Sequence, residues 1–298
     1  MACTCQVLGT KEHWDHVYTR EVRVFEETDG QEEGEVWFGE DTLERMCELV
    51  AEVTAANAAR EAAGLAEGDP WRVLVVGCGN GTTMVALTQD GFTQILGTDY
   101  SPQSVELSRR VVAAHEARMG TAFPGLTAQE DDVLASTLPE RSFELAVDKG
   151  TLDAVGLHPT RKALHRRLYL ATIRRVLVPG GLFVITSCNS TREEISAEVC
   201  AEDARGLGGG LEGQDGGGAE REAGAGAEAG AEAGAEAPAG SLVDEYEALA
   251  ASWPAGMFEV VDWVKTHPSF EFGGVSGSKV ATVAFRWAPL PADEEPAV

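Results

Sequence analysis

The sequence predicts an α/β protein with a doubly wound, mostly parallel seven-stranded sheet that ends in an antiparallel pair of strands. From residue 73 to residue 181, short runs rich in β-branched residues alternate with longer amphipathic stretches, which is the pattern of β-α-β units. The first run ends in a glycine-rich turn, Gly77-Cys-Gly-Asn-Gly81, and two further β-type runs lie near the C-terminus. A hydrophobic share of 44% in 298 residues is enough to fill a large core.

The N-terminal elements are expected to be two helices that form a lid or buttress of the same domain, residues 1–70. The helices span Lys11–Glu27 and residues 40–60, and the loop between them contains Glu35-Val-Trp-Phe-Gly39. Both helical stretches carry apolar residues at the spacing of one helical face.

The α/β core is expected over residues 71–200, where five short apolar runs have the length of buried strands. The five predicted parallel strands are residues 73–76, 94–98, Leu126–Glu130, 143–147 and 182–186. The predicted covering helices are Thr82–Gln89, residues 101–118 and residues 161–177. Ser101-Pro102 supplies an N-cap and a first-turn proline, and Leu177-Val-Pro-Gly-Gly181 is expected to turn the chain sharply into the fifth strand.

The C-terminal third begins with a compositionally biased segment. Residues 201–240 are nearly all Gly, Ala and Glu without apolar periodicity, so we expect a disordered insert. Residues 241–288 are expected to supply a helix and two strands, at 258–265 and 279–287, which complete the sheet as an antiparallel pair. Residues 289–298 read as a flexible tail.

Composition excludes several function classes. No run approaches the roughly 18 apolar residues of a membrane span, and the N-terminus lacks a basic stretch followed by an apolar one, so neither membrane insertion nor secretion is expected. The six cysteines lack C-x-x-C spacing, which argues against a disulfide framework and against a metal site and favours a cytosolic protein. A net charge of −26 argues against nucleic acid as a partner. Such a charge attracts a basic protein surface, or only keeps the chain soluble.

The glycine-rich turn is the strongest chemical signal. Gly77, Gly79 and Gly81 follow an apolar strand and open a helix, so the backbone and the helix N-terminus can form a polar cradle for an adenosine-bearing cofactor. The alternative is a turn chosen only for tight packing. Alone, the motif does not separate NAD from S-adenosylmethionine.

Two further acidic positions narrow this choice. Asp99 follows the second strand at roughly 20 residues from the first glycine, where a carboxylate accepts hydrogen bonds from both ribose hydroxyls. An ordinary helix N-cap is the competing interpretation of Asp99. Tyr100 beside it either flanks the adenine ring or only packs.

The third strand ends in Glu130-Asp-Asp-Val133, and one of its acids can accept a hydrogen bond from the adenine amino group. Asp131 and Asp132 are both candidates, with Asp132 preferred and Val133 at the ring. This second acid favours S-adenosylmethionine over a dinucleotide.

The fourth strand delivers the candidate catalytic residues Asp148, Lys149 and Asp153 to the carboxyl edge of the sheet, where open α/β sheets bind ligands. Methyl transfer from a sulfonium is an in-line displacement that needs alignment and a neutral nucleophile. A lysine acceptor must therefore lose its proton, and apolar burial lowers its pKa. For Asp148, a plain ion pair with a neighbour is the alternative.

Aromatic residues in the N-terminal segment offer a lid over the cofactor. This segment contains Trp14, Tyr18, Trp37 and Phe38, whose ring faces can attract the sulfonium cation. From periodicity alone, a hydrophobic contact with the sheet is an equal alternative.

Taken together, several motifs resemble the translation elongation factor 1-alpha lysine methyltransferases, which are seven-β-strand, class I, Rossmann-like enzymes. These motifs are Leu8-Gly-Thr-Lys-Glu-His-Trp-Asp15, Glu35-Val-Trp-Phe-Gly-Glu40, the Gly77 turn, Asp148-Lys-Gly-Thr151 and Ile185-Thr-Ser-Cys-Asn189. The resemblance covers nearly the whole chain except residues 201–240 and the last residues. It implies S-adenosylmethionine as cofactor, a lysine of elongation factor 1-alpha as acceptor, and a location in the cytoplasm and the nucleus. Separately, we expect a monomer.

The resemblance also implies the cofactor-binding residues. They are Trp14, Tyr18, Trp37, Gly77, Asp99, Tyr100, Asp132 with Val133, and Lys149. The chain departs from the family pattern in the long insert after the Asn189 rim, which bears on substrate docking, and in the paired acids Asp131-Asp132. The remaining alternatives are methylation of another protein or of a small molecule, a dehydrogenase, and a cofactor-binding scaffold without catalysis.

Overall fold

The computed structural model describes residues 7–201, 256–267, 270–272, 275–277 and 280–289. These residues belong to one of the two units into which the chain divides, the unit made of residues 1–202 and 254–298. The predictions of a disordered insert, of a helix directly after it and of a flexible tail therefore lie outside the described residues.

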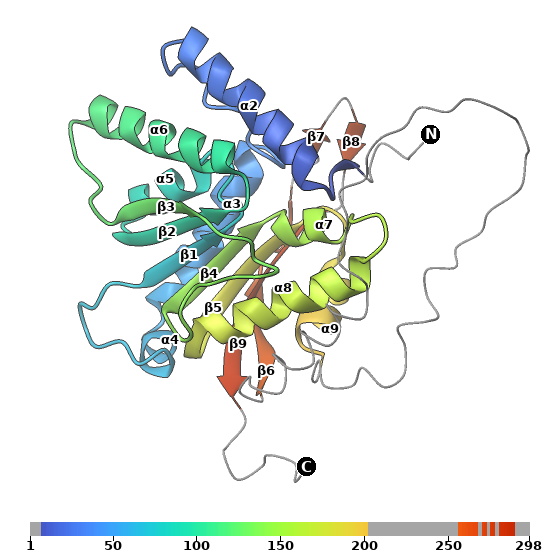
Figure 1. The fold of residues 1–298 in the computed structure, drawn as a ribbon. Helices are drawn as coiled ribbons and strands as arrows, with labels where there is room; N and C mark the ends of the chain where they lie inside the picture. The colour runs from blue at the N-terminus through green and yellow to red at the C-terminus, as the bar shows by residue number, and fades with distance from the viewer. Residues whose placement is uncertain (1–6, 202–255, 268–269, 273–274, 278–279, 290–298) are drawn as a thin grey trace, which may run out of the picture. The chain divides into compact units, whose positions relative to one another are not determined.

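The central sheet has seven strands in the order β3-β2-β1-β4-β5-β9-β6 (Figure 1). Its strands are β1 (Arg72–Val76), β2 (Gln94–Asp99), β3 (Leu126–Glu130), β4 (Phe143–Lys149), β5 (Leu177–Ser187), β6 (Gly256–Trp263) and β9 (Ala281–Pro289). The strands from β3 to β5 pair in parallel, whereas β9 pairs antiparallel with both β5 and β6. A separate two-stranded ribbon joins β7 (Phe270–Phe272) to β8 (Val275–Gly277). The predicted fold class is confirmed.

Helices cover both faces of the sheet because successive strand residues point to opposite sides. Val73 and Val75 pack against α3 (Glu40–Ala55), α4 (Asn57–Ala62) and α5 (Thr82–Gln89). Their neighbours Leu74 and Val76 pack against α7 (Thr151–Val155), α8 (Lys162–Val176) and α9 (Arg192–Val199). The central strands β1, β4 and β5 are therefore buried on both faces, as their apolar runs predicted, whereas β3 at the edge of the sheet buries only Ala128.

The N-terminal helix α2 (Lys11–Glu27) packs against α6 (Pro102–Met119) beside the sheet (Figure 1). A third apolar cluster, which includes Trp14 and Tyr18 of α2 with Leu107 and Val111 of α6, joins the two helices. None of the helices that the structure describes is long and apolar enough to cross a membrane.

Several boundaries differ from the prediction. The expected helix over residues 40–60 is interrupted at Ala56, whose extended backbone separates α3 from α4. Residues 177–181 are not a turn: they form the first part of β5, with a register shift against β4. Gly180 explains this irregular start, because its φ is +80° and a Cβ there would lie 1.8 Å from the carbonyl oxygen of Ala62. The helices α7 and α9 were not predicted.

Candidate functional site

The glycine turn leaves the carboxyl end of β1 and leads into α5. Gly77, Gly79 and Gly81 all have positive φ values, of 62°, 57° and 85°, which favour glycine. A Cβ on Gly77 would lie 2.1 Å from Oγ1 of Thr151, and one on Gly81 would lie 2.9 Å from Cα of Ser108. Packing against α7 and α6 therefore requires two of these glycines, whatever ligand the turn binds.

Gly79 differs from the other two glycines because it faces the aromatic side chains of α2. A Cβ at this position would lie 2.9 Å from the hydroxyl oxygen of Tyr18. The Gly79 N–H donates to Oδ2 of Asp99, at 3.2 Å. The turn, the end of β2 and α2 thus meet at Gly79.

Asp99 lies where the sequence placed it, at the end of β2 beside the turn. Its Oδ1 accepts a hydrogen bond from the Ser101 N–H at 2.9 Å, so each carboxylate oxygen is held by one backbone donor. Burial raises the pKa of Asp99, and the two backbone hydrogen bonds oppose that rise. Ser101 occupies the N-cap position of α6 without a side-chain cap bond.

The acids after β3 have distinct environments. Asp131 is buried, and its Oδ1 accepts from the N–H of Thr137 at 3.0 Å, which closes the loop after β3. Asp132 is exposed and lies near Tyr100: burial raises the pKa of that phenol, and the carboxylates of Asp99 and Asp132 raise it further. Of the two candidates, Asp132 is the one whose carboxylate is accessible beside Tyr100. Val133 packs at the edge of the α7–α8 core.

The N-terminal aromatic residues form one group. The ring centroid of Trp14 lies 4.7 Å from that of Trp37 and 6.0 Å from that of Tyr18. The Trp14 indole N–H donates to the carbonyl of Leu8 at 2.8 Å, which ties the group to the start of the described chain. Burial raises the pKa of Tyr18 well above its ordinary value, so its hydroxyl stays protonated. Contact of these rings with a cofactor stays a prediction.

The loop that carries Trp37 is held by side chains from three elements. Oε1 of Glu21, in α2, accepts from the Glu35 N–H at 3.2 Å. Nδ2 of Asn80, in the glycine turn, donates to the Glu35 carbonyl at 3.3 Å. Nζ of Lys149, at the end of β4, donates to the Trp37 carbonyl at 2.9 Å. The predicted lid is thus fixed to the turn and to the central strand.

Lys149 also lies over the ring of Phe38, with Nζ 5.8 Å from the centroid. Burial lowers the pKa of Lys149 to about 8, although the nearby Asp148 carboxylate opposes this shift.

Asp148 does not lie on the open rim that the sequence suggested. Its side chain is 0% exposed, and its oxygens accept from the N–H groups of Thr151 at 2.7 Å and Leu152 at 2.9 Å and from the hydroxyl of Tyr169. The alternative of a plain ion pair is not what the structure shows either. The carboxylate caps the first turn of α7, and burial raises its pKa to about 6.

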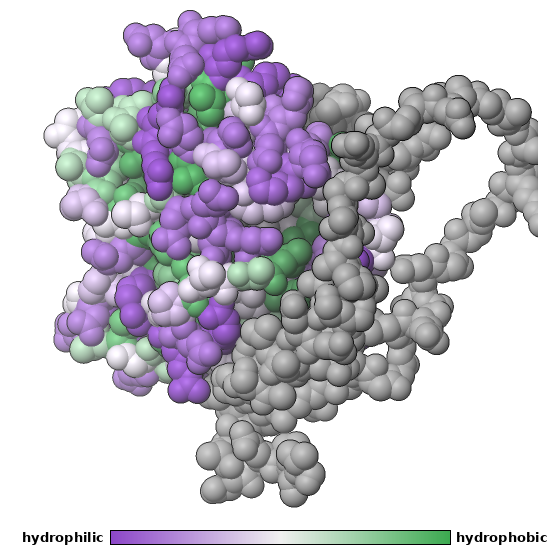
Figure 2. All heavy atoms as spheres, in the orientation of Figure 1, coloured by the Kyte–Doolittle hydropathy of each residue, from purple (hydrophilic) through white to green (hydrophobic). Residues whose placement is uncertain are grey.

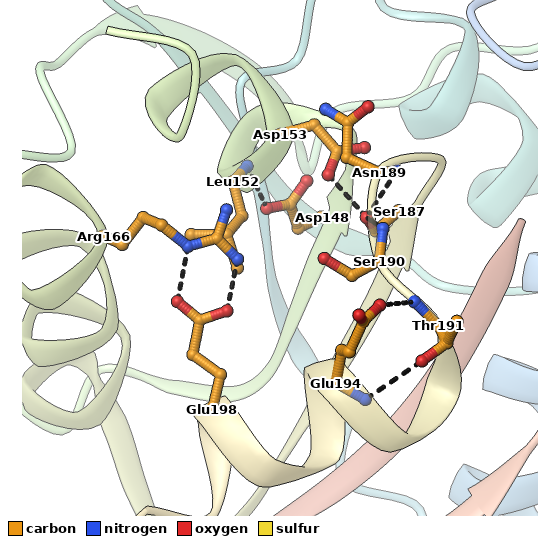
Figure 3. Close-up of polar contacts among 10 residues, drawn as sticks. All are labelled: Asp148, Leu152, Asp153, Arg166, Ser187, Asn189, Ser190, Thr191, Glu194 and Glu198. Carbon is orange, nitrogen blue, oxygen red and sulfur yellow. Dashed lines mark hydrogen bonds and ion pairs between the residues drawn. The ribbon is translucent and has the colours of Figure 1, made fainter. Parts of the chain in front are cut away.

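Asp153, on α7, is directed toward the loop after β5 (Figure 3). Its Oδ1 accepts from the hydroxyl of Ser187 and its Oδ2 accepts from the Cys188 N–H at 2.8 Å. The Ser187 oxygen in turn accepts from the N–H groups of Asn189 at 3.1 Å and Ser190 at 3.2 Å. Asp153 therefore fixes the course of residues 187–190 at the carboxyl edge of the sheet.

Sequence reasoning missed the groups that hold this edge together. Tyr169 reaches Asp148 from the middle of α8, and no local motif signals such a contact. The capping box of α9, in which Thr191 and Glu194 bond reciprocally, was visible as Thr191-Arg-Glu-Glu194. Arg166 and Glu198 join α8 to α9 by a paired ion pair (Figure 3).

Comparison with known proteins gives one consistent family. Residues 69–224 match the model of a methyltransferase domain family. The chain is 35% identical to human EEF1A lysine methyltransferase 2 over 191 residues, 64% of this chain and 72% of the human protein. It is 33% identical to the Danio rerio protein of the same name over 188 residues, 63% of this chain and 72% of that protein. It is 35% identical to protein-lysine N-methyltransferase efm4 of Schizosaccharomyces pombe over 198 residues, 63% of this chain and 78% of that protein.

Three observations indicate the same family. They are the parallel sheet with its antiparallel strand β9, the glycine turn with Asp99 beside it, and the similarity to the relatives. The chain belongs to the methyltransferase family, among the EEF1A lysine methyltransferases.

Proposed function

We propose that this protein transfers a methyl group from S-adenosylmethionine to a lysine side chain of translation elongation factor 1-alpha. The observation that carries the substrate is the similarity to the fish and human relatives named EEF1A lysine methyltransferase 2, and the fission yeast relative is named a protein-lysine N-methyltransferase. The observation that carries the cofactor is the carboxylate of Asp99 held against the glycine turn.

The residues at the carboxyl edge of the sheet fit this cofactor. Asp99 would accept hydrogen bonds from the ribose hydroxyls. Asp132 would accept one from the adenine amino group, and Tyr100 would flank the adenine ring. The rings of Trp14 and Trp37 would lie near the positive sulfur, which aromatic faces attract. When bound, the cofactor supplies an activated methyl group on a sulfonium.

The protein's contribution to the reaction is alignment. Lys149 holds the Trp37 loop through its hydrogen bond to the Trp37 carbonyl. Asp148 orients α7 and Asp153 orients the rim after β5, so both act as positioning residues. The acceptor amine must be neutral to attack, and a water-poor environment beside the aromatic group lowers its pKa.

Charge supports a basic substrate. The chain has 49 Asp and Glu residues against 23 Lys and Arg residues. Three of the acidic residues, Glu12, Asp15 and Asp132, lie near Tyr100. A negative field at the cofactor end of the sheet attracts a lysine-rich surface and shortens the search for the productive encounter.

Transfer of labelled methyl groups from S-adenosylmethionine to purified elongation factor 1-alpha tests the proposal. The wild-type chain should label one lysine, which mass spectrometry of peptides identifies. Asp99→Asn should bind S-adenosylhomocysteine at least about tenfold more weakly in calorimetry, because it loses hydrogen bonds to a charged acceptor. Lys162→Gln, an exposed change on α8, is the matched control and should behave as wild type.

The two halves of the proposal can fail separately. Unlabelled elongation factor together with normal cofactor binding would remove the substrate and leave another protein or a small molecule as acceptor. Equal cofactor affinity of wild type and Asp99→Asn would remove the assigned cofactor site.

A further inference from the structure

A recess lies beyond β5, on the same edge of the sheet as the glycine turn. It has a volume of about 240 Å³, and its lining includes Ser190, Thr191, Arg192, Trp263, Lys265 and Thr282. The strand pairing locates it: Ser187 at the end of β5 pairs with Ala281 at the start of β9, and Trp263 at the end of β6 pairs with Val283. The recess therefore borders the rim that Asp153 fixes, with β4 and β5 between it and β1.

The charges of this recess oppose those of the rest of the chain. Two of its lining residues, Arg192 and Lys265, are cationic, and several others carry hydroxyl groups, whereas no carboxylate belongs to the lining. Lys265 is exposed and has no ion-pair partner among the residues that the structure describes. Because Arg192 forms an ion pair with Glu193, the local excess of positive charge in this acidic chain comes from Lys265.

Arg192 is fixed in place by its surroundings. Its guanidinium lies over the ring of Trp263, 4.4 Å from the centroid. Nε and Nη2 both bond Glu193, at 2.9 Å for Nε, and leave Nη1 without an acceptor in the described part of the chain. The capping box of Thr191 and Glu194 fixes the backbone from which Arg192 projects. A held guanidinium loses less side-chain entropy on binding a carboxylate than a free one does.

We propose that this recess binds an acidic side chain of the protein substrate, an aspartate or glutamate close to the methylated lysine, with Lys265 and Arg192 as the specificity-determining residues. This inference rests on the proposed protein-lysine methylation and adds a rule for choosing the lysine. The recess does not suit the acceptor lysine itself, because two cations would repel a third. The hydroxyls of Ser190 and Thr191 can donate hydrogen bonds to a bound carboxylate.

The first experiment measures carboxylate binding without any methyl transfer. The full chain, labelled with ¹⁵N, is titrated with N-acetylglutamate N-methylamide and separately with its glutamine analogue, while the indole N–H signal of Trp263 is followed by NMR. A Trp263→Phe sample assigns that signal. The glutamate compound should shift the signal saturably, and the glutamine compound should not.

Single variants then identify the cations. Lys265→Gln and Arg192→Gln should each weaken the binding of the glutamate compound about fivefold, the effect expected of one charge in a partly exposed pair. Lys162→Gln leaves it unchanged. Equal shifts by both compounds, or a wild-type titration curve in Lys265→Gln, would overturn the carboxylate site.

The second experiment asks whether the site selects substrate. Lys265→Glu should raise the KM for elongation factor 1-alpha about tenfold at unchanged kcat and unchanged affinity for S-adenosylhomocysteine, because it replaces attraction by repulsion. An unchanged KM would remove the role in substrate selection even if the glutamate compound binds. If the wild-type chain does not methylate the factor at all, the proposed function fails, while the titration still decides the carboxylate site.

Discussion

Among the site residues, Asp148 has the environment that least resembles its expected one. Its position directly after an apolar strand predicted an exposed carboxylate at the ligand edge, but its contacts depend on α7 and α8, which fold back over it. Three donors point at one buried carboxylate, so removing the acceptor leaves them unsatisfied. Such a group is expensive to change.

Asp148→Asn should lower the free energy of unfolding by about 1–3 kcal/mol at neutral pH, because an amide accepts through only one oxygen and its NH₂ would face the donors that bond the other oxygen. Urea unfolding measures the loss. Tyr169→Phe, which removes one donor and keeps the acceptor, is the matched control and should cost less.

The stability difference between wild type and Asp148→Asn should depend on pH, and the pKa of Asp148 gives the direction. Burial raises the pKa of Asp148 in the folded chain to about 6, above its unfolded value near 3.9. The folded state therefore binds more protons between about pH 4 and pH 6, and the stability from this group falls as the pH rises through that window. The difference between wild type and Asp148→Asn should be larger at pH 4 than at pH 7. A constant difference would mean that Asp148 titrates normally.

Among the helices and strands, the capping box at the start of α9 links the rim after β5 to the cationic recess. Thr191→Ala should destabilise the protein by about 1 kcal/mol, because it leaves the Glu194 N–H without its acceptor. Thr191→Ser keeps the oxygen and should restore most of the loss in urea unfolding. The Ala variant should also weaken binding of the glutamate compound. Equal stability of the Ala and Ser variants would exclude the cap as the cause.

The sequence predicted the elements that a local apolar pattern defines. It did not predict those that depend on contacts between residues distant in the chain. The alternation of apolar runs located the five parallel strands, because burial between two helical layers imposes it. The short helix α7 was missed because its five residues depend on Asp148 as a cap rather than on periodicity. The placement of Asp99 beside Gly79 followed from the order of strands, whereas the burial of Asp148 and Asp153 depends on contacts with residues 21 and 34 positions away.

For the whole molecule, charge is the dominant surface property. Hydrophilic residues gather on α2 at the top of Figure 2 and lie between apolar patches over the rest of the coloured surface, and the net charge is −26. If the substrate is a basic protein surface, raising the salt from about 50 to about 300 mM should raise its KM several-fold, because the Debye length falls below about 10 Å. The kcat should stay constant in steady-state assays. A KM that does not respond to salt would contradict electrostatic attraction.

The position of β9 in the sheet also constrains how the chain can fold during synthesis. The hydroxyls of Thr186 and Thr282 hydrogen-bond across β5 and β9 although they are 96 positions apart. Until residues 281–289 leave the ribosome, the edge of β5 that pairs with β9 has no partner, and β6 has no strand through which to join the sheet. The nascent enzyme therefore carries an open strand edge while residues 188–289 are synthesised, about a third of the chain, and such an edge is prone to aggregation.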